Sequence, residues 1–141
     1  MKPSLISPRR PFLAAALAAL GIALAGCATT TPATPEQAVE KRANEYWQAR
    51  IAGQYEKAYD LSTPSYRKLR SAQQFKQQFG AGVAVKTAEV ARVLCEAEKC
   101  TATIKLGVSP AVLRMKLDTI ATHVDETWLL EDGQWWHYQD L

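Results

Sequence analysis

The hydrophobic period of this chain changes once, close to residue 82, and this change limits the possible folds more than any other feature. Between Thr34 and Gly80 the apolar residues recur every three or four positions, as they do in amphipathic helices. From Val83 onward apolar and polar residues alternate, which is typical of strands with one buried face. Helices followed by a run of strands predict an α+β fold with an antiparallel sheet.

The helical half carries recognisable start and stop signals. Thr34 can cap the first helix, Gln37 three residues later completes a capping box, and Gly53 ends the helix. Ser71 and Gln74 repeat the capping pattern before a later helix. The residues expected to face the core share a side at helical spacing: Val39, Ala43, Tyr46, Trp47 and Arg50, then Tyr55, Ala58, Tyr59 and Ser62, then Tyr66 and Leu69, and finally Phe75 and Phe79.

Strands are expected at residues 83–95 and 100–108, and in a long segment from Met115 to Leu130 that requires a bulge or a bend. Asp132-Gly133 predicts a tight hairpin before the closing strand WWHYQ. In the long strand His123 and Asp125 have the parity opposite to the apolar set, so both are expected to face solvent unless a bulge reverses the parity. That apolar set is Ile120, Val124, Trp128 and Leu130.

Residues 1–26 have the layout of a bacterial lipoprotein signal peptide. Lys2, Arg9 and Arg10 precede a fourteen-residue apolar run that is shorter than the ~20 residues of a membrane span. The run closes with LAGC, which resembles a lipobox, so we expect Cys27 to carry the lipid and to be the link to the membrane. The alternative is a chance cysteine after an ordinary signal peptide. Ala28 is not the Asp associated with inner-membrane retention, and this favours the outer membrane, facing the periplasm.

Residues 27–35 are expected to hold the lipidated cysteine and a Thr/Pro-rich tether, and residues 36–141 form the domain. The charge of the mature chain excludes one class of partner. Without the three basic residues of the leader, seventeen bases become fourteen, which equals the fourteen acids. A neutral chain gives no electrostatic reason to bind nucleic acid or an anionic bilayer surface.

Cys95 and Cys100 are expected to form a disulfide across a tight hairpin, because the leader directs the chain to an oxidising compartment. A metal site is disfavoured, since two thiols without a nearby His or Asp lack a ligand set. A redox-active pair is disfavoured as well, because such pairs usually have the CxxC spacing at a helix start.

The segment YWQARIAGQYEKAYDLSTPSYR, followed by strands that end in WLLEDGQWW, resembles the nuclear transport factor 2-like superfamily. More narrowly, it resembles small lipoproteins of Gram-negative bacteria with this cystatin-like fold, over Glu36 to the C-terminus. The resemblance implies helices on the concave face of a strongly curved antiparallel sheet, forming a cone with a pocket at its mouth. Candidate pocket residues are Tyr46, Trp47, Arg50, Tyr59 and Trp128. The tryptophans also fit a plain core role, and Arg50 fits a side chain that extends past the helix end to water.

Enzymes of this superfamily, such as ketosteroid isomerase, resemble one another in using a pocket carboxylate or histidine with tyrosines. Here Asp60, His123 and Asp125 are expected to face solvent, and the sequence does not decide which side of the sheet His137 faces. We therefore expect a non-enzymatic protein without a cofactor or metal. The expected function is a binding module for a small apolar ligand or an envelope protein. The first alternative is an assembly subunit or homodimer that uses the outer sheet face, and the second is an acid–base enzyme of the ketosteroid isomerase type.

Overall fold

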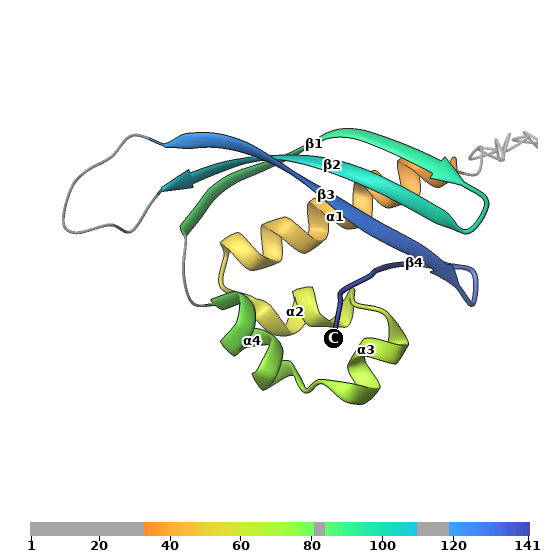
Figure 1. The fold of residues 1–141 in the computed structure, drawn as a ribbon, viewed down its shortest axis with the longest axis horizontal. Coiled ribbons are helices and arrows are strands. Elements are labelled where there is room, and N and C mark those ends of the chain that lie inside the picture. Colours follow the sequence, from red (N-terminus) through yellow and green to blue (C-terminus); the bar gives the residue numbers. More distant parts are fainter. Residues whose placement is uncertain (1–32, 81–83, 110–118) are drawn as a thin grey trace, which may run out of the picture. The chain divides into compact units, whose positions relative to one another are not determined.

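The computed structural model describes residues 33–80, 84–109 and 119–141 of the chain. Residues from Thr31 onward form one compact unit with its own hydrophobic core. Four helices come first and a curled four-stranded antiparallel sheet follows, which confirms the predicted α+β fold (Figure 1). The elements are α1 Pro35–Ile51, α2 Tyr55–Asp60, α3 Pro64–Leu69, α4 Ala72–Gly80, β1 Ala84–Glu96, β2 Lys99–Ser109, β3 Ile120–Glu131 and β4 Gln134–His137.

The predicted capping boxes of α1 and α4 are both present. Thr34 Oγ1 accepts a hydrogen bond from the Gln37 backbone N–H at 3.3 Å, and Gln37 Oε1 accepts one from the Thr34 N–H at 3.1 Å. Ser71 and Gln74 make the same reciprocal pair at 3.2 and 2.9 Å. These bonds satisfy backbone donors that the first turn of a helix leaves free, so both starts are fixed by local sequence.

The sheet has the order β1-β2-β3-β4, and each strand pairs antiparallel with the next. A disulfide joins Cys95 and Cys100 across the β1–β2 hairpin, as predicted. The bulge prediction is wrong for the described part of the long strand, because β3 pairs with β2 without interruption from Ile120 to Leu129. Residues 115–118 lie outside the described residues.

The irregularities lie instead in β1, between Val85 and Thr87 and between Val90 and Arg92. In the described sheet, β1 pairs with a neighbour on one side only. An extra residue in such a strand therefore disrupts fewer hydrogen bonds than it would in a strand that is paired on both sides.

The core lies between α1 and the sheet, with α2 packed against α1 and α4 packed against α2 (Figure 1). Its largest fully buried side chains include Trp128, Tyr46, Tyr66 and Phe75. Leu69 was expected to be buried beside Tyr66, and this expectation is wrong, because its side chain is 63% exposed. Leu69 is the last residue of α3, and the chain leaves the helix in an extended conformation at Arg70.

The end of β4 closes the fold against the link between α2 and α3. The backbone N–H of Thr63 donates to the carbonyl of His137 at 3.0 Å, and the N–H of His137 donates to the carbonyl of Leu61 at 2.8 Å. This short parallel bridge pairs Ser62 with His137. It fixes His137 with its side chain inside the molecule, where it is 7% exposed. Among the helices in the described ranges, we find none with the length and apolar character needed to cross a membrane.

Candidate functional site

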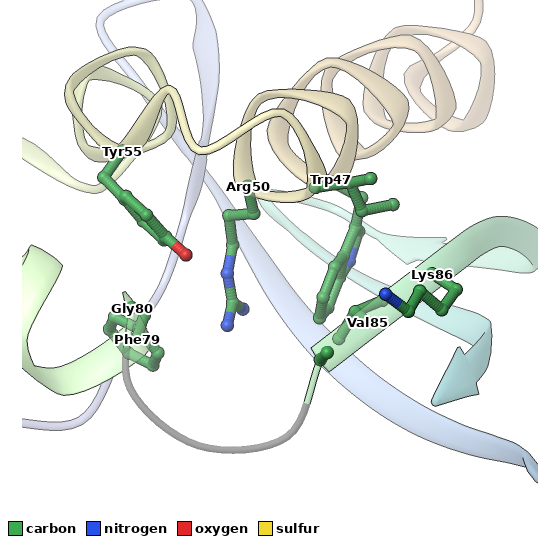
Figure 2. Close-up of a pocket in the computed structure, with 9 residues that line it drawn as sticks. Trp47, Arg50, Tyr55, Phe79, Gly80, Val85 and Lys86 are labelled. Carbon is green, nitrogen blue, oxygen red and sulfur yellow. The ribbon is translucent and has the colours of Figure 1, made fainter. Parts of the chain in front are cut away.

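A cavity of about 270 Å³ opens between the end of α1, the end of α4 and the start of β1, and we call it the Arg50 cavity. Aromatic and aliphatic side chains form much of its wall, and two cations, Arg50 and Lys86, line it. Figure 2 shows the Arg50 side chain extending from α1 into the space between Tyr55, Phe79 and Trp47. The full lining is Trp47, Arg50, Ile51, Tyr55, Phe79, Gly80, Ala84, Val85 and Lys86.

Arg50 is held by aromatic rings. Its guanidinium carbon lies 4.5 Å from the ring centre of Trp47, 4.9 Å from that of Phe79 and 5.5 Å from that of Tyr46. The negative faces of aromatic rings attract a cation at such distances. No carboxylate among the described residues forms an ion pair with Arg50. The half-buried side chain therefore lies across the rings of the cavity wall with its charge unneutralised.

A second cavity, of about 430 Å³, adjoins the first and shares Trp47, Arg50 and Phe79 with it. We call it the Glu126 cavity, because the carboxylate of Glu126 belongs to its wall and is 8% exposed. Residues from α1, α4, β3 and the C-terminal segment meet here. The full lining is Tyr46, Trp47, Arg50, Gln78, Phe79, Val124, Asp125, Glu126, Thr127, His137, Tyr138, Gln139 and Asp140.

The hydroxyl of Tyr46 is the centre of a polar network in this wall. It accepts hydrogen bonds from Gln139 Nε2 at 3.3 Å and from Arg50 Nη1 at 3.4 Å. Gln139 Oε1 in turn accepts from Ser62 Oγ at 3.2 Å. Burial raises the pKa of the Tyr46 phenol to about 12, against the opposing effect of the Arg50 charge. The phenol is therefore neutral at physiological pH and keeps a hydrogen that it can donate.

Glu126 and His137 form a close pair beside Tyr46. His137 Nε2 lies 3.5 Å from Glu126 Oε1, and the His137 ring lies 4.3 Å from that of Tyr46. The other carboxylate oxygen, Glu126 Oε2, and the other ring nitrogen, His137 Nδ1, are buried without a hydrogen-bond partner in the described structure. Buried polar atoms are nearly always hydrogen-bonded, so two such atoms side by side are unusual, and a bound water or a polar group of a ligand would supply the missing partner.

The predicted pocket residues separate into two groups. Tyr46, Trp47 and Arg50 come together in the walls of the two cavities. Tyr59 and Trp128 line neither cavity. The hydroxyl of Tyr59 donates to the backbone carbonyls of Arg67 and Arg70, at 3.1 and 2.7 Å, and Trp128 is fully buried in the core.

The four titratable residues weighed for catalysis also separate. Asp60, His123 and Asp125 are exposed as predicted, and Asp125 accepts a hydrogen bond from Thr103 on the neighbouring strand at 2.7 Å. The expectation that Ile120 and Val124 face the core is wrong, because their side chains are 55% and 36% exposed. His137, whose face the sequence left open, points inward. Among the described residues, no three His, Cys, Asp or Glu side chains come together in a group that could hold a metal ion.

The sequence reasoning missed Glu126 and Gln139. Glu126 lies two residues before Trp128 and so has the inward parity of β3, which was the available signal. Gln139 follows β4 and reaches Tyr46 across 93 residues of sequence, and nothing local announces that contact. In the closing stretch WWHYQ, Trp135 is only 6% exposed and His137 is buried, whereas Tyr138 is 43% exposed.

The comparisons with known proteins show a similarity of fold alone. No protein-family model matches the chain, and no curated protein matches it. A SEC-C motif containing protein from Psychrobacter arcticus is similar with a TM-score of 0.58 at 11% identity, over 76% of this chain and 62% of that one. Another, from Rhodopseudomonas palustris, gives 0.52 at 10% identity, over 66% of this chain and 69% of that one.

A protein named as an NTF2-like transpeptidase, from Campylobacter jejuni, is similar with a TM-score of 0.52 at 9% identity. The match covers 72% of this chain and 98% of that one. The fold that this chain resembles is therefore found both in an NTF2-like protein and in SEC-C motif proteins, and fold does not determine function.

Proposed function

We propose that this protein is a lipid-anchored lipoprotein of the bacterial envelope, facing the periplasm from the outer membrane, and that its domain is a non-catalytic binding module. The ligand is a small molecule with an apolar body and an anionic group. The apolar body packs against Trp47 and Phe79, and the anionic group meets the guanidinium of Arg50. The leader pattern supports the anchor, and the two cavities support the binding module.

The observation that carries the binding proposal is the state of Arg50. A half-buried guanidinium that lies against aromatic rings and has no carboxylate partner in the described structure is available to pair with an anion. The Glu126 cavity, at about 430 Å³, has the size of a small-ligand site, and the Arg50 cavity adjoins it.

The test uses anilinonaphthalene sulfonate, a fluorescent probe with an aromatic body and one anionic group. Protein produced from the full sequence by export in a Gram-negative host is purified in mild detergent and titrated with the probe. We expect saturable one-site binding, and we expect Arg50→Met to weaken it by about tenfold, the cost of one charged hydrogen bond.

Arg67→Met is the matched control. Arg67 also lies against an aromatic ring, 4.9 Å from the centre of Trp136, and it lines neither cavity. The control variant should bind the probe like the unmodified protein. Equal losses in the two variants, or no saturable binding in the unmodified protein, would contradict the proposal.

The assembly alternative has weaker support. The outer face of the sheet carries mainly polar side chains in its paired rows, such as Thr103 beside Asp125 and Lys105 beside His123. An interface between copies of a chain is usually more apolar than this. A homodimer through the sheet stays a prediction.

One observation favours an acid–base function as the second candidate. Glu126, His137 and Tyr46 form a carboxylate, imidazole and phenol group in one cavity wall. We rank it second because a phenol with a pKa of about 12 is a weaker proton donor near neutral pH than an ordinary tyrosine.

A further inference from the structure

We propose that the ligand is a small zwitterion of amino-acid type, with its carboxylate on Arg50, its ammonium group on Glu126 and its apolar side chain against the apolar wall of the Arg50 cavity. This inference rests on the proposed function and narrows the ligand from an apolar anion to a molecule that carries both charges. A free amino acid and a short peptide with free ends share this chemistry.

The charges of the two cavities are separated, and this separation is the first argument. The Arg50 cavity is lined by two cations, Arg50 and Lys86, and by no acidic side chain. The Glu126 cavity is lined by the carboxylates of Glu126 and Asp140 against the single guanidinium of Arg50, while the carboxylate of Asp125 lies on the outer face of the sheet, where it accepts a hydrogen bond from Thr103. An anion without a compensating positive charge is repelled by the second cavity, whereas a zwitterion that extends across the boundary satisfies both.

The second argument is the free oxygen of Glu126. The carboxylate is more than nine-tenths buried, one oxygen lies 3.5 Å from His137, and Oε2 has no partner among the described residues. A carboxylate oxygen only accepts hydrogen bonds, so the complementary ligand group is a donor, and an ammonium group supplies both donors and the opposite charge.

Tyr46 connects the two charged ends. Its hydroxyl accepts from Arg50 at 3.4 Å, and its ring lies 4.3 Å from the ring of His137, the partner of Glu126. The charges of Arg50 and Glu126 act on the pKa of this phenol in opposite directions, although burial is the larger effect. Arg50 and Glu126 thus both act on one phenol without forming an ion pair with each other. A ligand with two charged groups can pair with both residues, because both line the Glu126 cavity.

The experiment compares four probes on the exported full-chain protein by nuclear magnetic resonance titration. Leucine has both charged ends, leucyl-leucine has them further apart, N-acetyl-leucine lacks the ammonium group and leucinamide lacks the carboxylate. We expect leucine or leucyl-leucine to bind. N-acetyl-leucine and leucinamide, which each lack one charge, should bind at least about tenfold more weakly than the tighter-binding of these two zwitterions. Tighter binding of leucine would identify the ligand as a free amino acid, and tighter binding of leucyl-leucine would identify it as a short peptide.

Glu126→Gln tests the assignment of the ammonium group. In this variant N-acetyl-leucine should bind as well as leucine does, while leucinamide should remain weak. Glu89→Gln removes an exposed carboxylate of β1 that lines neither cavity, and it should keep the preference of the unmodified protein. If Glu126→Gln fails to fold, the four probes on the unmodified protein still decide the question.

Failure of the inference and failure of the proposed function give different results. Saturable binding of anilinonaphthalene sulfonate that depends on Arg50, together with no binding of either zwitterion or with equal binding of leucine and N-acetyl-leucine, overturns the zwitterion and leaves the binding module. No saturable binding of any probe overturns both.

Discussion

Tyr46 combines a structural and a polar role in a single side chain. Its ring is fully buried and packs edge-on against Trp47, Phe75 and Trp128 at centre distances of 5.7 to 6.5 Å. Its hydroxyl accepts two hydrogen bonds at the cavity wall. The core therefore fixes the position of the hydroxyl, and the hydroxyl fixes Gln139 and the end of Arg50.

This burial makes a prediction about pH. The Tyr46 pKa is about 12 in the folded protein against an ordinary value of 10.0, so between these values the unfolded chain loses the proton that the folded chain keeps. The free energy of unfolding should therefore decrease as pH rises through this range, with up to about 1.4 kcal/mol per pH unit from this group. Urea unfolding at a series of alkaline pH values measures it.

Tyr46→Phe is the control for this pH dependence, because phenylalanine does not titrate. The variant should be less stable at neutral pH by about 1–3 kcal/mol, since Gln139 and Arg50 lose their acceptor, and its stability should decrease less steeply above pH 10. All other titrating groups are common to the two proteins. Identical slopes would show that Tyr46 does not titrate in this way.

Among the elements, the β1–β2 hairpin has a covalent as well as a hydrogen-bonded closure. Cys95 and Cys100 are a directly paired couple in the register, and they close a loop of six residues. Replacing both by alanine should lower the free energy of unfolding by about 2 kcal/mol in the chain-entropy model. Because Cys100 is fully buried, the lost sulfur adds to this cost.

Denaturant unfolding of the double variant, compared with the unmodified protein under reducing conditions, separates the loss of the cross-link from the loss of buried volume. Neither cysteine lines the two cavities, so binding of anilinonaphthalene sulfonate should be unchanged below the unfolding transition. A variant of full stability, or a folded variant that no longer binds the probe, would contradict this account.

Local sequence was sufficient to predict most of the helices and strands, but it was insufficient to predict the candidate site. Thr34 with Gln37, and Ser71 with Gln74, determine helix starts by contacts within four residues, and Asp132-Gly133 supplies the positive φ angles of the hairpin turn. Alternation alone predicted the outward faces of His123 and Asp125.

The same alternation predicts that Glu126 faces inward. Because inward positions are normally apolar, an acidic residue there has no explanation until its partner is known. That partner, His137, is eleven residues away on another strand, and its inward face depends on a bridge to Ser62. Contacts of this kind arise from tertiary packing. The register shifts in β1 are a second example, because no glycine or proline in β1 marks their position.

At the scale of the whole molecule, the compact unit from Thr31 onward has its own core, so the proposed anchor can be tested separately from the fold. Cys27→Ser should move the protein from the membrane fraction to the soluble periplasmic fraction, or retain it as unprocessed precursor. The thermal unfolding midpoint of the domain should stay unchanged. Fractionation of cells followed by immunoblotting measures the distribution.

The double variant of Cys95 and Cys100 is the matched control for the anchor, because it also removes thiols but leaves the lipobox intact. It should stay in the membrane fraction. A Cys27→Ser protein that is processed normally and remains fully membrane-bound would refute the lipoprotein assignment.

The hydrogen bonds of Gln139 join positions 77 and 93 residues apart, to Ser62 and to Tyr46. During synthesis the helices with Tyr46 and Arg50 emerge first, and the residues that complete the wall of the Glu126 cavity emerge last. Contacts between such distant positions form late and slowly. A nascent or C-terminally shortened chain would therefore carry an arginine ready for an anion but no complete cavity, and ligand capture would be a property of finished molecules only.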